Sequence, residues 1–333
     1  MNTFRICASG ILVICLIMGG SALGSELDIS GFVDVISTYQ SSQNDQNEFG
    51  LGQAEVDIEN ELSERSSIAV AIAYNNEDAV FELGEAEIGL NVWKSENSFF
   101  SSVDVTAGQF DVPFGIDYNV YPSIDRKLVT SPLAVDLTHD GWNDFGVRLN
   151  ATSPSWNLVV FGVNGFESSC MVSDAAQSLS LGVDVGDEVN TTPANAFGGR
   201  VGITPVPNFE FGGSFAVGIN ESNENEMAMY GGDVQWSMNQ FDFKGEYIAH
   251  SLNRSIEQED NAGYYFQGIY NFDRTFLVGR YDSFQPDGAD WCNRYSVGAG
   301  YSVVENIEVR FETQIDNENS DNNQNYLQLV AGF

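Results

Sequence analysis

Carboxylates recur at every second position in two segments of this 333-residue chain. Glu55, Asp57 and Glu59 form the first run, and Glu85 and Glu87 form the second. Successive side chains of a β-strand point to opposite faces, so a strand would place each run on one face. Fixed carboxylates along a water-filled passage concentrate cations, although each one could equally serve only to keep the passage solvated.

Basic residues occupy the corresponding positions of later segments. When the apolar residues of each segment are placed outward, five bases point inward: Arg148, Arg200, Lys244, Arg294 and Arg310. Three glutamates accompany them: Glu246, Glu308 and Glu312. Acids thus dominate the early segments, and bases appear mainly in the later ones. A passage with charges separated across its lumen has a transverse field that orients polar solutes.

Catalytic chemistry has few candidates in this sequence. His139 and His250 are its two histidines, and they lie on distant segments. The chain has no Cys-x-x-Cys or His-x-x-x-His pair and no phosphate-binding glycine loop. We interpret the Asn- and Asp-rich runs near residues 44–45 and 316–321 as solvated loop tips rather than Ca²⁺ sites. We therefore expect no enzyme activity, no cofactor and no dedicated metal site.

The amino-terminal residues predict an export signal. Arg5 precedes an apolar run over residues 11–18, and small residues before Ser25 suit signal peptidase. A membrane anchor is the alternative, but the apolar run is shorter than the roughly 20 residues of a spanning helix. We therefore expect residues 1–24 to be removed and residues 25–333 to form one domain.

Composition indicates a β protein that does not bind nucleic acid. Asp and Glu number 48 against 13 Lys and Arg, which gives a formal net charge of −35. The 33 Gly, 23 Phe and 13 Tyr favour many short strands. After the amino-terminal segment, no stretch is apolar enough for a membrane helix. If the chain spans a membrane, it must form a closed barrel, because other arrangements leave backbone groups unpaired in lipid.

Alternation of apolar and polar residues predicts sixteen strands of a length suited to crossing a bilayer at a tilt. The predicted strands span residues 29–40, 49–62, 66–75, 79–93, 99–110, 143–152, 155–165, 196–205, 208–220, 228–239, 240–251, 261–272, 274–284, 293–304, 305–316 and 325–333.

The joints between these segments alternate in length. Every second joint is short, as at residues 63–65, 153–154 and 272–274, whereas most others are longer and acidic, as at 111–142 and 166–195. Short turns on one side and long loops on the other are typical of outer-membrane barrels. The predicted fold is therefore an all-β, antiparallel, up-and-down transmembrane β-barrel of about 16 strands. A soluble protein of two packed sheets is the alternative.

Residues 107–115, Ala-Gly-Gln-Phe-Asp-Val-Pro-Phe-Gly, resemble a recurring stretch of the phosphate-selective porin O/P family and of the legiobactin-type siderophore porins. Residues 140–148 resemble the strand that follows the third loop in those proteins, and residues 29–34 resemble their first strand. The resemblance implies a porin barrel, often a homotrimer, with the third outer loop folded into the lumen. Phosphate-selective members are expected to line their constriction with Arg and Lys, whereas the matching region here is mostly acidic.

The third outer loop, residues 111–142, is the predicted constriction, with an exposed flap as the alternative. Its prolines stiffen it, and the small inward residues Ala69, Ala71 and Ala73 leave room beside the wall. The expected constriction residues are Asp111, Asp117, Asp125, Arg126, Lys127 and Asp136. Because acids outnumber bases there, we predict a modest cation preference, which basic residues clustered at the narrowest ring would reverse.

Two further features concern the outer face and the carboxyl terminus. Cys170 and Cys292 fall in two outer loops, where an oxidising medium would allow either a disulfide or two free thiols. Phe333 ends an alternating last strand and looks like the assembly signal of outer-membrane proteins.

Together these features predict a porin in the outer membrane of a Gram-negative bacterium. The leading hypothesis is a passive diffusion channel for small hydrophilic solutes or ions. The alternatives are a specific uptake porin for a siderophore, another chelate or a phosphate-type anion, and an outer-membrane enzyme or structural barrel. The expected partners are outer-membrane lipid and lipopolysaccharide, the barrel assembly machinery and two further copies in a homotrimer.

Overall fold

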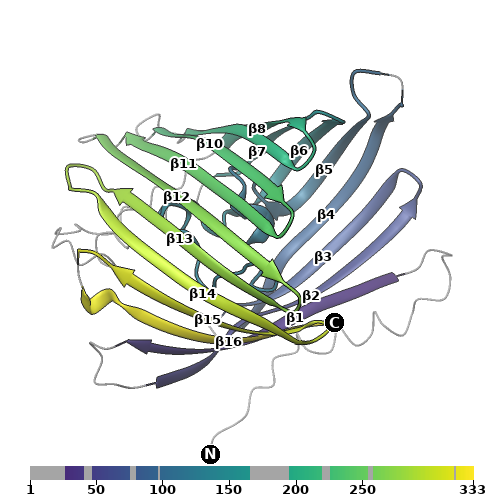
Figure 1. Ribbon diagram of the computed structural model, residues 1–333. Helices are drawn as coiled ribbons and strands as arrows, with labels where there is room; N and C mark the ends of the chain where they lie inside the picture. The colour runs from purple at the N-terminus through teal and green to yellow at the C-terminus, as the bar shows by residue number, and fades with distance from the viewer. Residues whose placement is uncertain are drawn as a thin grey trace, which may run out of the picture.

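Sixteen antiparallel strands close into one barrel in the computed structural model (Figure 1). Each strand pairs with its neighbours in the chain, and β1 pairs with β16 to complete the ring. The structure describes residues 27–40, 47–75, 80–96, 98–165, 195–219, 226–253, 258–318 and 320–333. The expected signal segment 1–24 and Cys170 lie outside these residues.

All sixteen predicted strands are present, and their ends differ from the predicted ones by at most three residues. The strands are β1 (Leu27–Gln40), β2 (Asn47–Ser63), β3 (Ser66–Asn75), β4 (Val80–Lys94), β5 (Ser102–Asp111), β6 (Asn143–Ser153), β7 (Trp156–Val163), β8 (Asn195–Val206), β9 (Phe209–Ile219), β10 (Glu226–Met238), β11 (Phe241–Asn253), β12 (Gln258–Phe272), β13 (Thr275–Gln285), β14 (Cys292–Val304), β15 (Ile307–Asp316) and β16 (Gln324–Gly332). No helix in the described part of the chain is long and apolar enough to cross a membrane.

Tight turns connect the strands at one end of the barrel. Four of these turns contain a residue with a left-handed backbone: Asn208, Asn239, Asp273 and Asn306. Asn and Asp tolerate this conformation better than other residues with a side chain. These residues therefore let the chain reverse within about two residues, as strands in a hairpin require.

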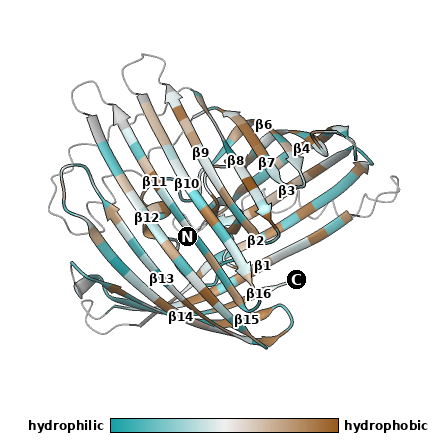
Figure 2. Ribbon diagram, turned by 45° about the horizontal axis from the view of Figure 1, so that its top comes forward, coloured by the Kyte–Doolittle hydropathy of each residue, from teal (hydrophilic) through white to brown (hydrophobic). Residues whose placement is uncertain are grey.

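The two faces of the barrel wall differ in polarity because the residues alternate along each strand. Figure 2 shows apolar and polar residues following one another along the strands. Leu277, Val297 and Phe311 are exposed on the outer surface, whereas Arg280, Glu312 and other charged side chains are buried inside. An apolar exterior around a polar interior is the pattern of a barrel that contacts lipid outside and water inside.

The segment between β5 and β6, residues 112–142, lies inside the barrel, and we call it the inner loop (Figure 1). It contains the short helices η1 (Asp117–Val120) and α2 (Leu133–Asp136), and α2 contacts β11, β12 and β13. A third short helix, η3 (Ser320–Asn322), precedes β16.

The main apolar core joins the inner loop to the wall. Phe114 and Leu133 of the inner loop are buried with Phe110, Ile248 and Phe284 from the strands. A smaller cluster packs Leu128 of the loop against Phe276 and Val278 of β13. Apolar side chains thus face inward on part of the wall that the loop covers, and this burial favours the folded position of the loop.

The carboxyl-terminal residue closes the seam between β1 and β16. The backbone N–H of Phe333 donates to the Gly31 carbonyl at 3.0 Å, and the Gly31 N–H donates to the Phe333 carbonyl at 3.2 Å. A Cβ atom at Gly31 would lie 2.8 Å from the Phe333 ring, so glycine allows this close approach.

Deleting Phe333 should lower the yield of folded, membrane-inserted barrel, because the seam loses two backbone hydrogen bonds and the ring that covers Gly31. The measurement is the fraction that migrates as a heat-modifiable species on gels after refolding. Phe333→Tyr keeps both contacts and should assemble normally. A deletion variant that refolds with the yield and rate of the unmodified protein would contradict this role.

Candidate functional site

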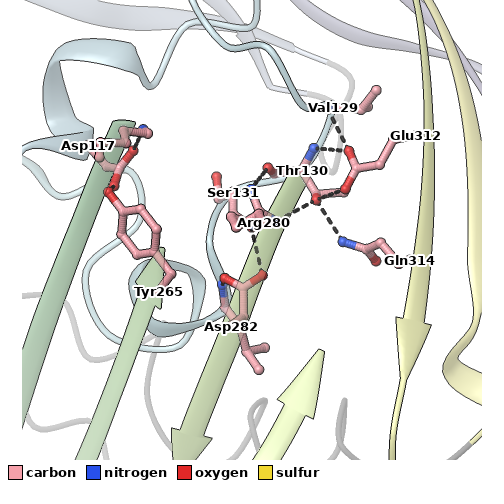
Figure 3. Close-up of polar contacts among 11 residues, drawn as sticks. Asp117, Val129, Thr130, Ser131, Tyr265, Arg280, Asp282, Glu312 and Gln314 are labelled. Atoms are coloured by element: carbon pink, nitrogen blue, oxygen red, sulfur yellow. Dashed lines mark hydrogen bonds and ion pairs between the residues drawn. The ribbon is translucent and has the colours of Figure 1, made fainter. Parts of the chain in front are cut away.

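Arg280 on β13 binds the inner loop to the wall of the barrel (Figure 3). Its guanidinium donates to the carbonyls of Thr130 and Ser131 at 2.8 and 2.9 Å and to the Thr130 hydroxyl at 3.0 Å. It also donates to Asp282 at 2.8 Å, and Asp282 accepts the Leu133 N–H at 2.9 Å. Both side chains are buried, so each charge is balanced by its partner and by loop backbone groups.

Glu312 on β15 binds the same stretch of the loop from a second direction (Figure 3). Its carboxylate accepts the N–H groups of Val129 and Thr130 at 2.7 and 3.0 Å and the Thr130 hydroxyl at 2.7 Å. Gln314 donates to the same hydroxyl at 2.7 Å. Residues 129–133 are therefore held by an extended network of charge-assisted hydrogen bonds.

Asp117 begins the helix η1 and contacts the adjoining part of the same wall at Lys244 of β11 and Tyr265 of β12. Lys244 forms an ion pair with its carboxylate, and the Tyr265 hydroxyl donates to it. Burial opposes ionisation of Asp117, but the nearby positive charge and the two hydrogen bonds outweigh it and lower its pKa. The predicted constriction residue Asp117 is thus a buried anchor of the loop.

Arg310 and Lys127 complete the attachment near β15. The guanidinium of Arg310 donates to the carbonyls of Ser123 and Ile124, and its side chain is almost fully buried. Lys127 on the loop lies 3.5 Å from Glu308 and over the Phe276 ring. Arg310, which the sequence placed along the pore, therefore holds the loop instead of facing open water.

The other three bases predicted to line the pore point inward and pair with acids of the wall. Arg148 lies 2.8 Å from Glu87. Arg200 contacts Asp233 and Glu210 at 2.6 and 2.7 Å, and Arg294 lies 3.5 Å from Asp316. Lys244 and Arg310, described above, bind the loop. Each of the five predicted bases thus has an acidic or loop partner.

Carboxylates on β2, β4 and β5 form the opposite side of the lumen. Glu55 lies near the carboxylates of Asp57 and Asp111, and Glu85 lies near Glu87, Arg148 and Asp111. Among the described residues, Glu55, Asp57, Glu59 and Glu85 form no ion pair. The structure places these acids on the same side of the lumen, where they outnumber the bases.

The remaining predicted constriction residues lie on the loop and near its start. Arg126 donates to Ser131 at 2.9 Å, and Asp125 lies beside it in the lumen. Asp111 ends β5 and accepts a hydrogen bond from Asn143 at 2.8 Å. Asp136 ends α2 with its side chain exposed to the lumen.

The pKa of Asp136 is raised to about 6. The main cause is the surrounding protein, which displaces bulk water from the neighbourhood of the carboxyl group. The negative charge of Asp140 adds to the effect, and Arg294 opposes it. Asp136 therefore gains a proton, and the lumen loses a negative charge, as the pH falls through about 6.

Sequence reasoning missed Arg280, Asp282 and Tyr265 as functional residues. Strict alternation from the exposed Leu277 puts Arg280 and Asp282 inside. The signal was obscured because Phe276 on that same inner face is apolar and packs against the loop.

The two histidines contribute to packing. His139 and His250 are both buried, and the His139 ring lies edge-on to Phe114 and hydrogen-bonds the Thr138 hydroxyl at 2.9 Å. Within the described residues, no group of three or more His, Cys, Asp or Glu side chains is placed to hold a metal ion. Cys292, predicted in an outer loop, is the first residue of β14 and is buried. Its pairing with Cys170 stays a prediction, because Cys170 lies outside the described residues.

Arg280→Leu should loosen the inner loop, because it leaves Asp282 buried without its guanidinium and frees the carbonyls of residues 130 and 131. Removing one partner of a buried pair costs about 3–5 kcal/mol. We expect faster proteolytic cleavage within residues 112–142 of the folded barrel, measured by mass spectrometry. Arg200→Leu removes another buried base, whose ion-pair partners lie on the wall and not on the loop, and it should leave cleavage unchanged. Equal protection in both variants would contradict the anchoring role.

Acidification should weaken any cation preference of the lumen between pH 7 and pH 5, because Asp136 becomes neutral there. The same pKa shift affects the stability of the fold. A carboxyl group whose pKa is raised in the folded state favours folding at low pH, and this contribution is lost as the pH rises through about 6. Reversal potentials at the two pH values measure the charge effect. Asp136→Asn should make the change smaller, and an unaltered pH dependence in that variant would exclude Asp136 as a contributor.

Comparison with known proteins finds similarity in structure alone. No family model matches the chain, and no curated relative matches it in sequence. The anion-selective porin from Comamonas acidovorans superposes with a TM-score of 0.68 at 11% identity, covering 93% of this chain and 100% of that one. OmpF of Salmonella typhi, in a complex with daunomycin, gives 0.66 at 12% identity over 94% and 99% of the two chains. The trimer form of OmpT, an outer membrane protein of Vibrio cholerae, gives 0.62 at 12% identity over 93% and 99%. The chain thus has the closed 16-stranded antiparallel fold of the outer-membrane porins.

Proposed function

We propose that this chain is an outer-membrane porin, a water-filled channel through which small hydrophilic solutes and ions diffuse passively, with a modest preference for cations. The observation that carries this proposal is that the bases inside the barrel have partners, whereas several carboxylates have no ion-pair partner among the described residues. The bases of the wall bind the inner loop or pair with acids, as Arg280 and Arg200 do. Carboxylates such as Glu55 and Glu85 remain without an ion-pair partner among the described residues.

Aromatic side chains at both ends of the barrel support its placement in a bilayer. At the end with tight turns, Phe99 lies against Trp156, and Phe241 lies against Tyr270. At the other end, the rings of Tyr264, Trp291, Tyr281 and Tyr295 form a contiguous group on β12, β13 and the region before and within β14. Two aromatic belts on either side of an apolar band are characteristic of barrels in outer membranes.

The cation preference follows from the position of the free carboxylates. Charges on the wall of a narrow passage are poorly screened within about 8–10 Å at ordinary salt. Glu55, Glu85 and Asp111 lie near one another on adjacent parts of the wall, so their potentials add. Cations should be enriched beside this wall and anions depleted, and the preference should weaken as salt rises.

Assembly and partners are further parts of the proposal. The expected environment is outer-membrane lipid with lipopolysaccharide, which the chain would reach through the barrel assembly machinery. The trimer form of the Vibrio cholerae protein supports a homotrimer. An anion-conducting channel of the phosphate type is the second candidate, favoured by the resemblance of residues 107–115 and by the anion-selective porin of similar fold.

Replacing the free carboxylates Glu55 and Glu85 together by Gln should reduce the cation preference, because it removes two ionisable carboxylates from the wall. The measurement is the reversal potential of the refolded protein in planar bilayers under a KCl gradient. Glu64→Gln removes one charge from an exposed turn and serves as the matched control, for which we expect no change. Anion preference in the unmodified channel would overturn the cation reading and favour the phosphate-type alternative.

A further inference from the structure

A cavity of about 210 Å³ lies between the inner loop and strands β10 to β13. Two rows of side chains cross these strands and form its wall. In the first row, Gln235 pairs with Lys244, Lys244 with Gln267, and Gln267 with Arg280 in the strand register. The second row, one pleat nearer the tight turns, contains Ser237, Asp242 and Ile269. The inner loop supplies the facing side.

The charged groups of this cavity are largely engaged within the protein. Lys244 forms an ion pair with Asp117. Arg280 uses four of its N–H groups on Asp282 and the loop, so it has little capacity for a ligand. Asp242 accepts a hydrogen bond from Asn271 at 2.7 Å. On the loop side of the cavity, Lys127 pairs with Glu308, Arg126 donates to Ser131, and Asp125 lies near Lys127 and Arg310. A strongly charged ligand would therefore meet charges of both signs that already have partners or opposite charges nearby.

The amide of Gln267 is the exception to this internal pairing. Its side chain is only 5% exposed and lines the cavity, and it has no hydrogen-bond partner in the part of the chain that the structure describes. Its amide atoms are not among the described side-chain atoms that are closed off from solvent without a partner, so water in the cavity can satisfy them until the hydroxyl groups of a solute replace it. Gln235, at the exposed rim of the same row, offers a second free amide.

We propose that this cavity is a binding site for a neutral polyhydroxylated solute of monosaccharide size, within the channel proposed above. Free amides, the Ser237 hydroxyl and the remaining carboxylate oxygen of Asp242 offer both donors and acceptors, which vicinal hydroxyl groups match. Ile269 and Val120 provide apolar surface for the carbon face of a sugar ring. The site rests on the proposed channel function and adds a substrate class to it.

The test is a glucose titration of the channel in phosphatidylcholine bilayers. Binding in the lumen predicts a conductance that falls to a plateau with rising glucose, beyond the decrease expected from solution viscosity. Gln267→Leu should raise the half-saturating concentration about five- to ten-fold, the range expected for one lost hydrogen bond. Gln235→Leu, at the exposed rim, should produce a smaller shift and gives a second reading if the first variant folds poorly.

Asn150→Leu is the matched control, because it removes an amide from the face of β6 that carries Arg148, outside the cavity. It should leave the titration unchanged. A conductance that falls only in proportion to viscosity would overturn the site. Half-saturating glucose concentrations that equal the unmodified value in both glutamine variants would also overturn it. Saturation by the zwitterion glycine, without saturation by glucose, would overturn the polyhydroxylated class. If the unmodified protein does not conduct, the channel proposal fails, and calorimetric titration of the detergent-folded barrel with glucose still decides whether the site binds.

Discussion

The interior of this barrel depends on the pairing of Arg280 with the backbone of residues 130 and 131. Loop carbonyls in the middle of a barrel need hydrogen-bond donors, since buried polar groups without partners are costly. Arg280 supplies these donors from the wall, and Asp282 balances its charge while binding the Leu133 N–H. With this segment fixed, the loop can bury Leu128 and Leu133 against the wall, and the lumen acquires a defined shape.

The same pairing decides which charges remain free. Strands on the loop side use their bases to hold the loop or to neutralise nearby acids, so this side contributes little net potential to the open lumen. Within the described residues, Glu55, Asp57 and Glu85 on the wall formed by β2 to β5 form no ion pair, and in the channel proposed above they are the carboxylates that mobile ions meet. Anchoring of the loop and ion selectivity are thus linked. A base whose charge is balanced by the loop or by a nearby acid adds little positive potential to the open lumen.

The sequence predicted the strands because alternation within a single strand is a local property, and the inward direction of the carboxylates was inferred from the same alternation. It could not predict the partner of Asp117, because Lys244 lies 127 residues away and the contact depends on the path of the inner loop. Arg280 was missed for a related reason. The inner face of β13 carries Phe276 and Phe284, whose apolar character makes sense only once the loop is known to cover them.

The pairing of β1 with β16 joins the two ends of the described chain, and it affects the order in which the strands can pair during folding. Hairpins between consecutive strands can form early, since their residues are close in sequence. The last seam must wait for the whole chain, and until then β1 and β16 are edges with unpaired backbone groups that invite pairing with other chains. Productive folding therefore competes with aggregation until the ring closes, and the rate of closure sets how long the chain stays vulnerable.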